Sequence, residues 1–310
     1  MKVLVLGNGA HTNKRIIPAL NKIKKIDSIF VGDRNVNKLN KVDDVLSIIN
    51  YEDAFKLIQD IDLTIIATPP YNHKESLRKI NGKSKSILIE KPLSNEIKFI
   101  NSNEFKSIYD SGVVFESIMY FHHPIWEKVK NIINNGEIRE IYAEFCVPHQ
   151  PIDGHRYKKE MGGGSLNDQG IYPISLVTDL FHDEYEIENI EILKNDKYEV
   201  DLGGGLNLVS KDIYISCKWG LGDDYKNSLQ LIDKSKNEYK IDFIFSKPDN
   251  TETKITLNNE VSEELQVGVF DQFEIMYNDI LKENLSRFKY SSYENILKRY
   301  KLYNSIKNCL

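Results

Sequence analysis

The stretch Ile87-Leu88-Ile89-Glu90-Lys91-Pro92 is the part of the sequence that decides the fold. Its three apolar residues indicate a short strand buried on both faces, as found in a parallel sheet that is covered by helices. A charged pair and a proline follow at the carboxyl end of this strand. Open parallel sheets bind ligands in the crevice outside such strand ends. The pattern therefore predicts that Lys91 faces a binding site.

Short apolar runs alternate with helical segments through the first third of the chain. We expect strands at residues 3–6, 28–31, 46–49, 63–67, 87–89 and 113–118, and helices at residues 14–24, 51–59, 73–80 and 96–109. Repeated strand–helix units of this kind predict an α/β fold with a doubly wound parallel sheet of the Rossmann type.

The pattern changes near residue 119. A long strand-like run at 138–147 and a helix at 166–181 precede strands at 185–193, 213–221, 239–245 and 252–257, and helices at 271–284 and 293–309 close the chain. Strands gathered in this way predict an α+β domain with a large, mostly antiparallel open sheet. We expect a dinucleotide-binding domain over residues 1–118 and a substrate-binding and oligomerisation domain over residues 119–310.

Composition narrows the class of protein. The 310 residues suit two domains, and 41% hydrophobic with 28% charged residues is a globular composition. A net charge of -5 provides no basic field for nucleic acid. Three widely spaced cysteines argue against a disulfide framework and show no paired metal spacing. No apolar run is long enough for a signal peptide or a membrane span, so we expect a cytoplasmic protein.

The segment Gly7-Asn8-Gly9-Ala10-His11-Thr12 follows the first expected strand and opens the first helix. Gly7 permits a tight turn, and Gly9 lets the backbone approach a pyrophosphate at the helix N-terminus. Thr12 stands where the dinucleotide fingerprint has its third glycine, so the match is partial. A plain turn is the alternative interpretation.

Asp33 lies at the expected end of the second strand, with Arg34 directly after it. A carboxylate at this place accepts hydrogen bonds from the adenosine ribose and favours NAD. The Arg34 guanidinium is suited to the 2′-phosphate of NADP. We expect NAD as the cofactor with NADP possible, and a solvated Asp–Arg pair in a turn is the alternative.

The glycine run at residues 162–164 leads to Asp168, Gly170 and Tyr172. Residues four apart share one face of a helix, so Asp168 and Tyr172 are expected to point the same way. Gly170 leaves room between them for a ring or a ligand. Separately, Asp168 suits the helix dipole and Tyr172 suits a core. These separate roles do not explain why the glycine run, the acid and the phenol occur together.

These segments, in this order, resemble the Gfo/Idh/MocA family of sugar and cyclitol dehydrogenases. The resemblance rests on Gly7-x-Gly9, on Ala67-Thr68-Pro69 with His73, on Glu90-Lys91-Pro92, on the Asp168 segment and on Asp271-Gln272-Phe273. It covers most of the chain. It implies an NAD(P)-dependent enzyme that exchanges a hydride with a hydroxyl or keto carbon of a sugar, nucleotide sugar or cyclitol. Tyr172, where many members have His, resembles the branch of glucose–fructose oxidoreductase and dihydrodiol dehydrogenase.

The resemblance also implies roles for residues. The expected catalytic residues are Lys91, Asp168 and Tyr172, with Tyr172 as the acid or base and the Lys91 ammonium favouring its phenolate. The expected cofactor-binding residues are Gly7, Gly9, Ala10, His11, Asp33, Arg34, Thr68, Pro69, His73, Glu90 and Lys91. Relatives pair through the open face of the second sheet, so a homodimer or homotetramer is expected.

Polar residues before the glycine run are candidates to hold a carbohydrate-like substrate. They are His149, Asp153, His155, Arg156 and Tyr157, together with the pair His122 and His123. From these residues and Asp168, we expect His123, Arg156, Tyr157 and Asp168 to bind substrate. The guanidinium of Arg156 also suits a carboxylate or phosphate group of the substrate. Adjacent histidines on a strand point to opposite faces, so no metal site is expected. An NAD-dependent glycosidase and a dinucleotide-sensing regulator without activity remain alternatives.

Overall fold

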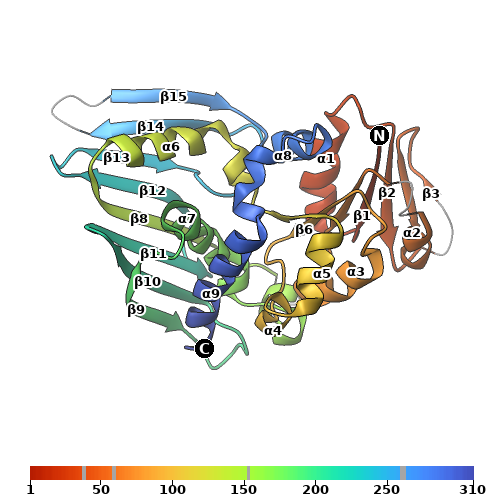
Figure 1. Cartoon of the computed structure of the whole chain (residues 1–310), viewed down its shortest axis with the longest axis horizontal. Helices are drawn as coiled ribbons and strands as arrows, with labels where there is room; N and C mark the ends of the chain where they lie inside the picture. Colours follow the sequence, from red (N-terminus) through yellow and green to blue (C-terminus); the bar gives the residue numbers. More distant parts are fainter. Residues whose placement is uncertain (37–39, 58–60, 152–153, 259–262) are drawn as a thin grey trace. The chain divides into compact units, whose positions relative to one another are not determined.

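The computed structural model describes residues 1–36, 40–57, 61–151, 154–258 and 263–310. Its chain divides into two compact units (Figure 1). The first comprises Met1–Ser117 and Phe273–Tyr293, and the second comprises Ile118–Gln272 and Glu294–Leu310. The sequence-based division placed all of 119–310 in one domain, whereas Phe273–Tyr293 returns to the first unit. There, Ser291 Oγ accepts a hydrogen bond from the backbone N–H of Glu116 (3.0 Å).

The first unit is built on a sheet with the strand order β3-β4-β2-β1-β5-β6-β7 in the described part of the chain. The strands are β1 (Lys2–Leu6), β2 (Ser28–Asp33), β3 (Asn40–Lys41), β4 (Leu46–Asn50), β5 (Leu63–Ile66), β6 (Ser86–Glu90) and β7 (Val113–Ser117). All neighbours pair in parallel except β3 with β4. This confirms the predicted doubly wound sheet. The chain order reverses between β1 and β5, where such sheets bind their ligands.

Helices follow most of these strands in the first unit. They are η1 (Thr12–Ile16), α1 (Ile17–Asn21), α2 (Tyr51–Leu57), η3 (Pro70–Asn72), α3 (His73–Ile80), α4 (Ile97–Ile100), α5 (Asn103–Ser111), α8 (Gln272–Leu281) and η8 (Leu285–Ser291). The helix expected at 96–109 is two helices, because Ser102 interrupts it. The Ser102 hydroxyl accepts the N–H of Phe105 (3.1 Å) and so caps α5.

The second unit contains a sheet with the order β15-β14-β13-β12-β8-β11-β10-β9 among its described residues. The strands are β8 (Ile138–Val147), β9 (Glu186–Leu193), β10 (Gly203–Ser210), β11 (Ile213–Leu221), β12 (Lys226–Asp233), β13 (Glu238–Asp242), β14 (Glu252–Asn258) and β15 (Glu263–Val269). Only β8 and β11 pair in parallel, so the predicted mostly antiparallel sheet is confirmed. Strands β10, β12 and β15 were not predicted from the sequence.

Helical segments of the second unit pack on one face of this sheet. They are η4 (Met119–His122), α6 (Pro124–Asn135), η5 (His155–Tyr157), η6 (Lys159–Met161), η7 (Leu166–Gly170), α7 (Ile171–Phe181) and α9 (Tyr293–Lys307), the last beginning at the end of the first unit. Residues 171–178 of α7 are all buried, because the helix lies over β8 and β11. Among the described residues, no helix has the length and apolar character to cross a bilayer.

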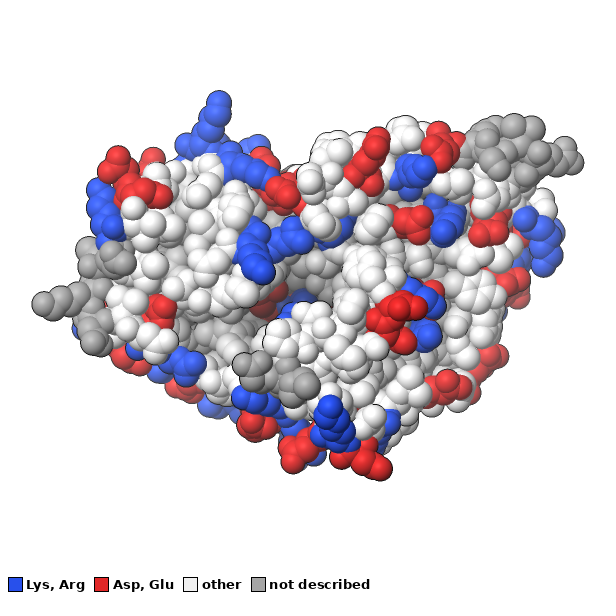
Figure 2. Space-filling view, turned by 180° about the vertical axis from the view of Figure 1, so that it is seen from behind, with Lys and Arg blue, Asp and Glu red and all other residues white. Residues whose placement is uncertain are grey.

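Charged side chains of both signs are interspersed on the face drawn in Figure 2. Lys and Arg side chains lie among Asp and Glu side chains there, in keeping with the net charge of -5.

Candidate active site

The glycine turn joins β1 to η1 at the carboxyl edge of the first sheet. Gly7 has φ +119°, and a Cβ on it would lie 2.8 Å from the carbonyl oxygen of Ala67. Only glycine fits here. Among the described residues nothing lies within 4 Å of a Cβ on Gly9, so the backbone there faces open space. Buried Thr12 donates its hydroxyl hydrogen to the Gly7 carbonyl (2.7 Å), which closes the turn where the fingerprint has a third glycine.

The first helical turn after the glycines is exposed at Ala10 and His11. His11 Nε2 lies 3.3 Å from Glu90 Oε1, at the end of β6. The His11 ring also meets the edge of Phe273, with centroids 5.5 Å apart. The segment that returns from the second unit thus packs on the helix that follows the glycine turn.

The Asp33 carboxylate ends β2 beside the glycine turn. It accepts hydrogen bonds from the backbone N–H of Asn35 and from the side chain of Asn8, both at 2.8 Å. The Asn35 N–H and the Asn8 amide hold the pKa of Asp33 below its ordinary value. The carboxylate is therefore ionised at neutral pH, and Arg34 beside it is exposed.

Residues after β5 form the neighbouring strand end. Thr68 Oγ1 is buried and has no hydrogen-bond partner in the described structure. His73 is fully buried, with Nε2 2.7 Å from the Thr68 carbonyl oxygen and Nδ1 3.0 Å from that of Pro92. Burial lowers the pKa of His73, and a neutral imidazole donates through one nitrogen only. His73 thus connects the ends of β5 and β6, and Pro69 lies at the N-terminus of η3.

The Glu90-Lys91-Pro92 segment follows at the end of β6. The Glu90 carboxylate is 8% exposed and accepts the Ser117 hydroxyl hydrogen (2.9 Å). Burial acts to raise the pKa of Glu90, but the His11 ring, the Lys91 ammonium and the Ser117 hydroxyl together leave it lowered. Lys91 is half-buried, and the Lys91–Pro92 peptide bond is cis. A carboxylate and an ammonium thus lie where the sequence placed them, at a strand end beside the glycine turn.

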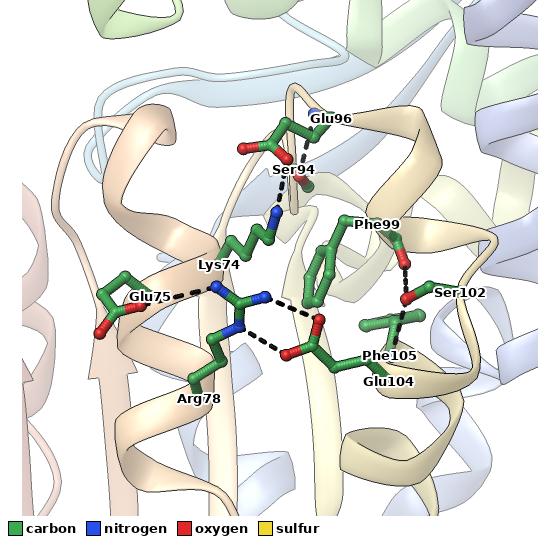
Figure 3. Close-up of polar contacts among 9 residues, drawn as sticks. All are labelled: Lys74, Glu75, Arg78, Ser94, Glu96, Phe99, Ser102, Glu104 and Phe105. Carbon is green, nitrogen blue, oxygen red and sulfur yellow. Dashed lines mark hydrogen bonds and ion pairs between the residues drawn. The ribbon is translucent and has the colours of Figure 1, made fainter.

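The chain after Lys91 is bonded to α3 at two points (Figure 3). Lys74 on α3 donates to Glu96 (2.7 Å). One turn later, Arg78 makes a two-pronged contact with Glu104 on α5, at 2.5 and 2.8 Å. The chain after Lys91 is therefore bonded to α3 both before α4, through Glu96, and after α4, through Glu104.

These features fit a bound dinucleotide. Gly7 and Gly9 supply a close backbone approach, Asp33 a ribose acceptor, and Thr68 a buried hydroxyl that lacks a partner in the described structure. All lie at the carboxyl ends of β1, β2 and β5, on both sides of the reversal in strand order.

In the second unit, Asp168 and Tyr172 lie across the junction of η7 and α7. The Asp168 side chain is 17% exposed, and its Oδ2 accepts the Nε–H of Arg156 and an amide hydrogen of Gln169 (2.7 Å). The Tyr172 ring, 3% exposed, meets Phe145 edge-on at 4.9 Å. This segment of the second unit therefore presents an ion pair and a phenol in aromatic surroundings.

The Tyr172 hydroxyl donates to Met119 Sδ (3.7 Å), and Phe245 lies 5.7 Å from the Tyr172 ring. A thioether is a weak hydrogen-bond acceptor.

Close packing accounts for the glycines around Asp168. Gly164 has φ +110°, and a Cβ on it would clash with Asp201, whose carboxylate accepts the Ser165 hydroxyl (2.5 Å) and the Leu166 N–H (2.6 Å). Beside Gly170, the space predicted for a ring or ligand holds the indole of Trp219, 3.1 Å from where a Cβ on Gly170 would lie. Neither Asp201 nor Trp219 was predicted from the sequence, because neither belongs to a motif.

Two of the expected substrate residues have structural contacts instead. His123 is fully buried, and its Nδ1 accepts the N–H of Ile125 (3.1 Å), which caps α6. Burial and the nearby Lys247 lower the pKa of His123 to about 3. Tyr157 accepts the backbone N–H of Gln150 (3.1 Å) and is 6% exposed.

The remaining candidates differ in their surroundings. His149 Nδ1 lies 3.0 Å from the Tyr157 hydroxyl, and His122 is fully buried. His155 is half-buried in η5. Asp153 lies outside the described residues. Arg156 and Asp168 are thus the expected substrate residues with partly exposed side chains.

Comparison with known proteins identifies the family. A model described as an oxidoreductase family with an NAD-binding Rossmann fold, that of Gfo/Idh/MocA proteins, matches residues 1–109. The model of the Gfo/Idh/MocA C-terminal domain matches residues 126–201. The two matches follow one another and together span more than half of the chain.

The individual relatives have low sequence identity and cover between about half and nearly all of this chain. The dTDP-3,4-didehydro-2,6-dideoxy-alpha-D-glucose 3-reductase of Saccharopolyspora spinosa is 23% identical over 93% of this chain and 86% of its own length. A trans-1,2-dihydrobenzene-1,2-diol dehydrogenase of Xenopus laevis is 27% identical over 44% of this chain and 41% of its own. The crystal structure of a 3-ketoreductase from Actinomadura kijaniata with NADP and TDP-benzene has the same fold, with a TM-score of 0.86, 21% identity and coverage of 99% and 97% of the two chains. The chain belongs to the Gfo/Idh/MocA family of NAD(P)-dependent oxidoreductases.

Proposed function

We propose that this enzyme oxidises or reduces one carbon of a sugar or nucleotide sugar, with Tyr172 as the acid or base. The observation that carries the proposal is the buried phenol of Tyr172 four residues after Asp168, in a chain whose other unit has a dinucleotide-binding edge. The names of the relatives support the substrate class, because they include a reductase of a dTDP-linked deoxyglucose.

The first unit supplies the residues that would hold the cofactor. Gly7, Gly9 and Ala10 would receive the pyrophosphate, Asp33 the ribose, and Thr68 a polar group near the β1–β5 reversal. The nicotinamide, when bound, takes or gives the hydride. The ionised Asp33 carboxylate favours NAD, and exposed Arg34 leaves NADP open as a second cofactor.

Tyr172 moves the proton that must accompany the change at the substrate carbon. Its ring is fixed by Phe145 and Phe245, and this apolar shell excludes water from the hydroxyl. A positioned acid or base contributes about 10²–10⁴-fold to the rate. A tyrosine has an ordinary pKa near 10, so a neighbouring cation is needed for it to act as a base at neutral pH.

We assign that cation to Lys91. Lys91 belongs to the first unit and Tyr172 to the second. The family resemblance supports their joint role, and measuring the activity of variants tests it. Asp168 and Arg156 are the proposed substrate contacts. Arg156 uses its Nε–H on Asp168, and its terminal nitrogens suit a phosphate or carboxylate of the substrate. His123 and Tyr157 are left out of the proposed site, because both are buried in structural contacts.

The test is a screen of sugars, nucleotide sugars and inositols with NAD and NADP, followed by the reduced cofactor's absorbance. Tyr172→Phe and Lys91→Met should each lower kcat by about 10²–10⁴-fold and leave cofactor binding intact. Tyr225→Phe and Lys98→Met, which alter exposed side chains, are the matched controls. Wild-type rates in Tyr172→Phe would remove the assignment of the proton to Tyr172.

A nitrophenyl glycoside distinguishes the glycosidase alternative, since a hydrolase releases the phenol without net reduction of NAD. Activity on the glycoside and none on free or nucleotide-linked sugars would replace the proposed reaction.

We further propose a homodimer or homotetramer that forms through the uncovered face of the second sheet. Tyr142 and Tyr214 lie together on neighbouring strands with ring centroids 6.2 Å apart, and Tyr142 alternates with the buried Ile141 and Ala143. Light scattering of Tyr142→Arg should show a smaller particle than the wild type, and an unchanged mass would contradict this interface.

A further inference from the structure

Asp168 opposes the proposed task of Tyr172. Residues four apart on a helix are neighbours, with Cβ atoms about 5–6 Å apart. A carboxylate on the same helical face as a tyrosine disfavours its phenolate. The aromatic rings of Phe145 and Phe245 around Tyr172 strengthen the effect, because charges interact more strongly where water is excluded. A nearby positive charge is therefore needed to offset the charge of Asp168.

Arg156 provides that positive charge. Its Nε–H bonds to Asp168 Oδ2, the oxygen that also accepts the Gln169 amide hydrogen. The Asp168 side chain is 17% and the Arg156 side chain 35% exposed, so the ion pair is sheltered from solvent more on the side of the acid. The guanidinium thus neutralises the charge of a largely buried carboxylate.

The glycine run holds Arg156 in place through its backbone. The Arg156 carbonyl oxygen accepts the Gly164 N–H at 2.9 Å. A Cβ on Gly163 would lie 2.5 Å from the same oxygen, so a larger residue would push the Arg156 backbone away. The close approach of these segments carries the guanidinium to Asp168.

We propose that Arg156 is a positioning residue that neutralises Asp168 and so allows Tyr172 to lose and regain its proton. The inference rests on the proposed function of Tyr172 and deepens it. Asp168 is then one half of an ion pair beside the acid–base residue, and it does not itself take the proton. The glycine run has the role of bringing the two halves together.

The second unit holds other ionisable groups, of which Tyr120 of η4 packs beside Tyr172 with ring centroids 6.3 Å apart. The others are His122 of η4, Cys146 of β8, Cys217 of β11, Asp179 further along α7 and Lys247 of the loop after β13. Burial raises the pKa of Cys217 to about 12 and that of Tyr120 well above its ordinary value. Burial lowers the pKa of Lys247 to about 7, so its titration lies far below that of a tyrosine.

The test is an ultraviolet difference titration of the tyrosines in the full chain without cofactor or substrate. Subtracting the curve of Tyr172→Phe from that of the wild type isolates Tyr172. Arg156→Gln should move this component up by about one pH unit. Asp168→Asn should move it down, and Arg156→Gln/Asp168→Asn should return it toward the wild-type position. Arg156→Lys, which keeps the charge, should restore part of the shift.

Arg139→Gln is the matched control. Arg139 lies at the start of β8, six residues before Phe145, and pairs with Asp212 at 3.6 Å. Six residues of strand span roughly 20 Å. This variant removes the same charge from the same unit and should leave the Tyr172 component in place.

An unchanged Tyr172 component in a folded Arg156→Gln protein would overturn the inference, as would a double variant that stays at the Arg156→Gln position. Circular dichroism at each pH confirms that the fold persists. Asp168→Asn decides the matter if Arg156→Gln does not fold. The pH profile of kcat/KM should shift in the same direction as the titration. Full activity in Tyr172→Phe would instead refute the proposed function, and the titration would still decide the electrostatic coupling.

Discussion

The indole ring of Trp219 fills the space that a side chain on Gly204 would need, and its Cζ2 would overlap a Cβ there. Trp219 and Gly204 are opposite one another on β11 and β10. The same indole, fully buried, lies 3.1 Å from the Cβ position of Gly170 in η7. One side chain thus explains two glycines that are far apart in the sequence. It also ties the sheet to the turn that carries Asp168.

Gly204→Ala should therefore destabilise the protein. The added methyl group would overlap Trp219 and a backbone carbonyl of Glu191, and overpacking of this kind costs about 1–3 kcal/mol. Gly205→Ala is the matched control, because the nearest atom to its Cβ position is 3.7 Å away. Urea unfolding of the two variants measures the difference. Equal stabilities would show that Trp219 can move without cost.

The same glycines limited the prediction of the fold. Residues 203–205 are glycines, which are depleted from strands, so no strand was predicted there. β10 forms by pairing with β9 and β11, and its glycines leave room for the indole of Trp219. β12 alternates in its burial at Asn227, Leu229, Leu231 and Asp233, but two of these four residues are polar, so the sequence pattern was weak. In the first unit, strands such as 63–66 were predicted closely, because consecutive apolar residues mark strands that are covered on both faces.

Acid should destabilise the protein partly through His123. Its folded pKa is lowered to about 3 from 6.5, so the unfolded chain binds the proton first as the pH falls. Stability is unaffected above pH 6.5 and falls by about 1.4 kcal/mol per pH unit below it, down to the folded pKa. His123→Asn keeps an oxygen acceptor for the cap of α6. Between pH 6.5 and 5 it should lose about 2 kcal/mol less than the wild type in urea unfolding. His182→Asn, at an exposed position, is the control. Identical pH dependence in His123→Asn would contradict the buried neutral ring.

Asp33 should determine the choice between NAD and NADP. Asp33→Ser removes the acceptor of the ribose hydroxyls and leaves Arg34 to meet a 2′-phosphate. Loss of a charge-assisted hydrogen bond costs about 1.5–3 kcal/mol, so the kcat/KM ratio of NAD to NADP should fall by about 10-fold or more. Asp43 accepts the backbone N–H of Val45 at 2.8 Å, as Asp33 does that of Asn35, so Asp43→Ser is the matched control. An unchanged ratio in Asp33→Ser would show that Asp33 does not contact the adenosine ribose.

The parts of the site that depend on local sequence were predictable. The Gly7 turn and Asp33 follow from strand ends and short motifs, and the structure gives both the expected conformation. The ion pair of Arg156 and Asp168 spans 12 residues and was missed, because a turn of several glycines leaves the separation of its ends undetermined. No pattern marked Asp201. The partnership of Lys91 and Tyr172 stays a prediction.

Asp201 should affect both stability and turnover. It lies 36 residues beyond Ser165, yet its carboxylate, 5% exposed, receives the Ser165 hydroxyl and the Leu166 N–H at the first turn of η7. Asp201→Asn replaces the charged acceptor of these two hydrogen bonds by a neutral amide oxygen, which costs about 1–3 kcal/mol. Because Asp168 lies in the same turn, kcat should fall as well. Asp179→Asn weakens a similar contact, from Trp126 Nε1 at 3.1 Å, at the far end of α7. It should lower stability and leave kcat unchanged. A loss of kcat in both variants would mean that stability alone, and not the position of the Asp168 turn, controls turnover.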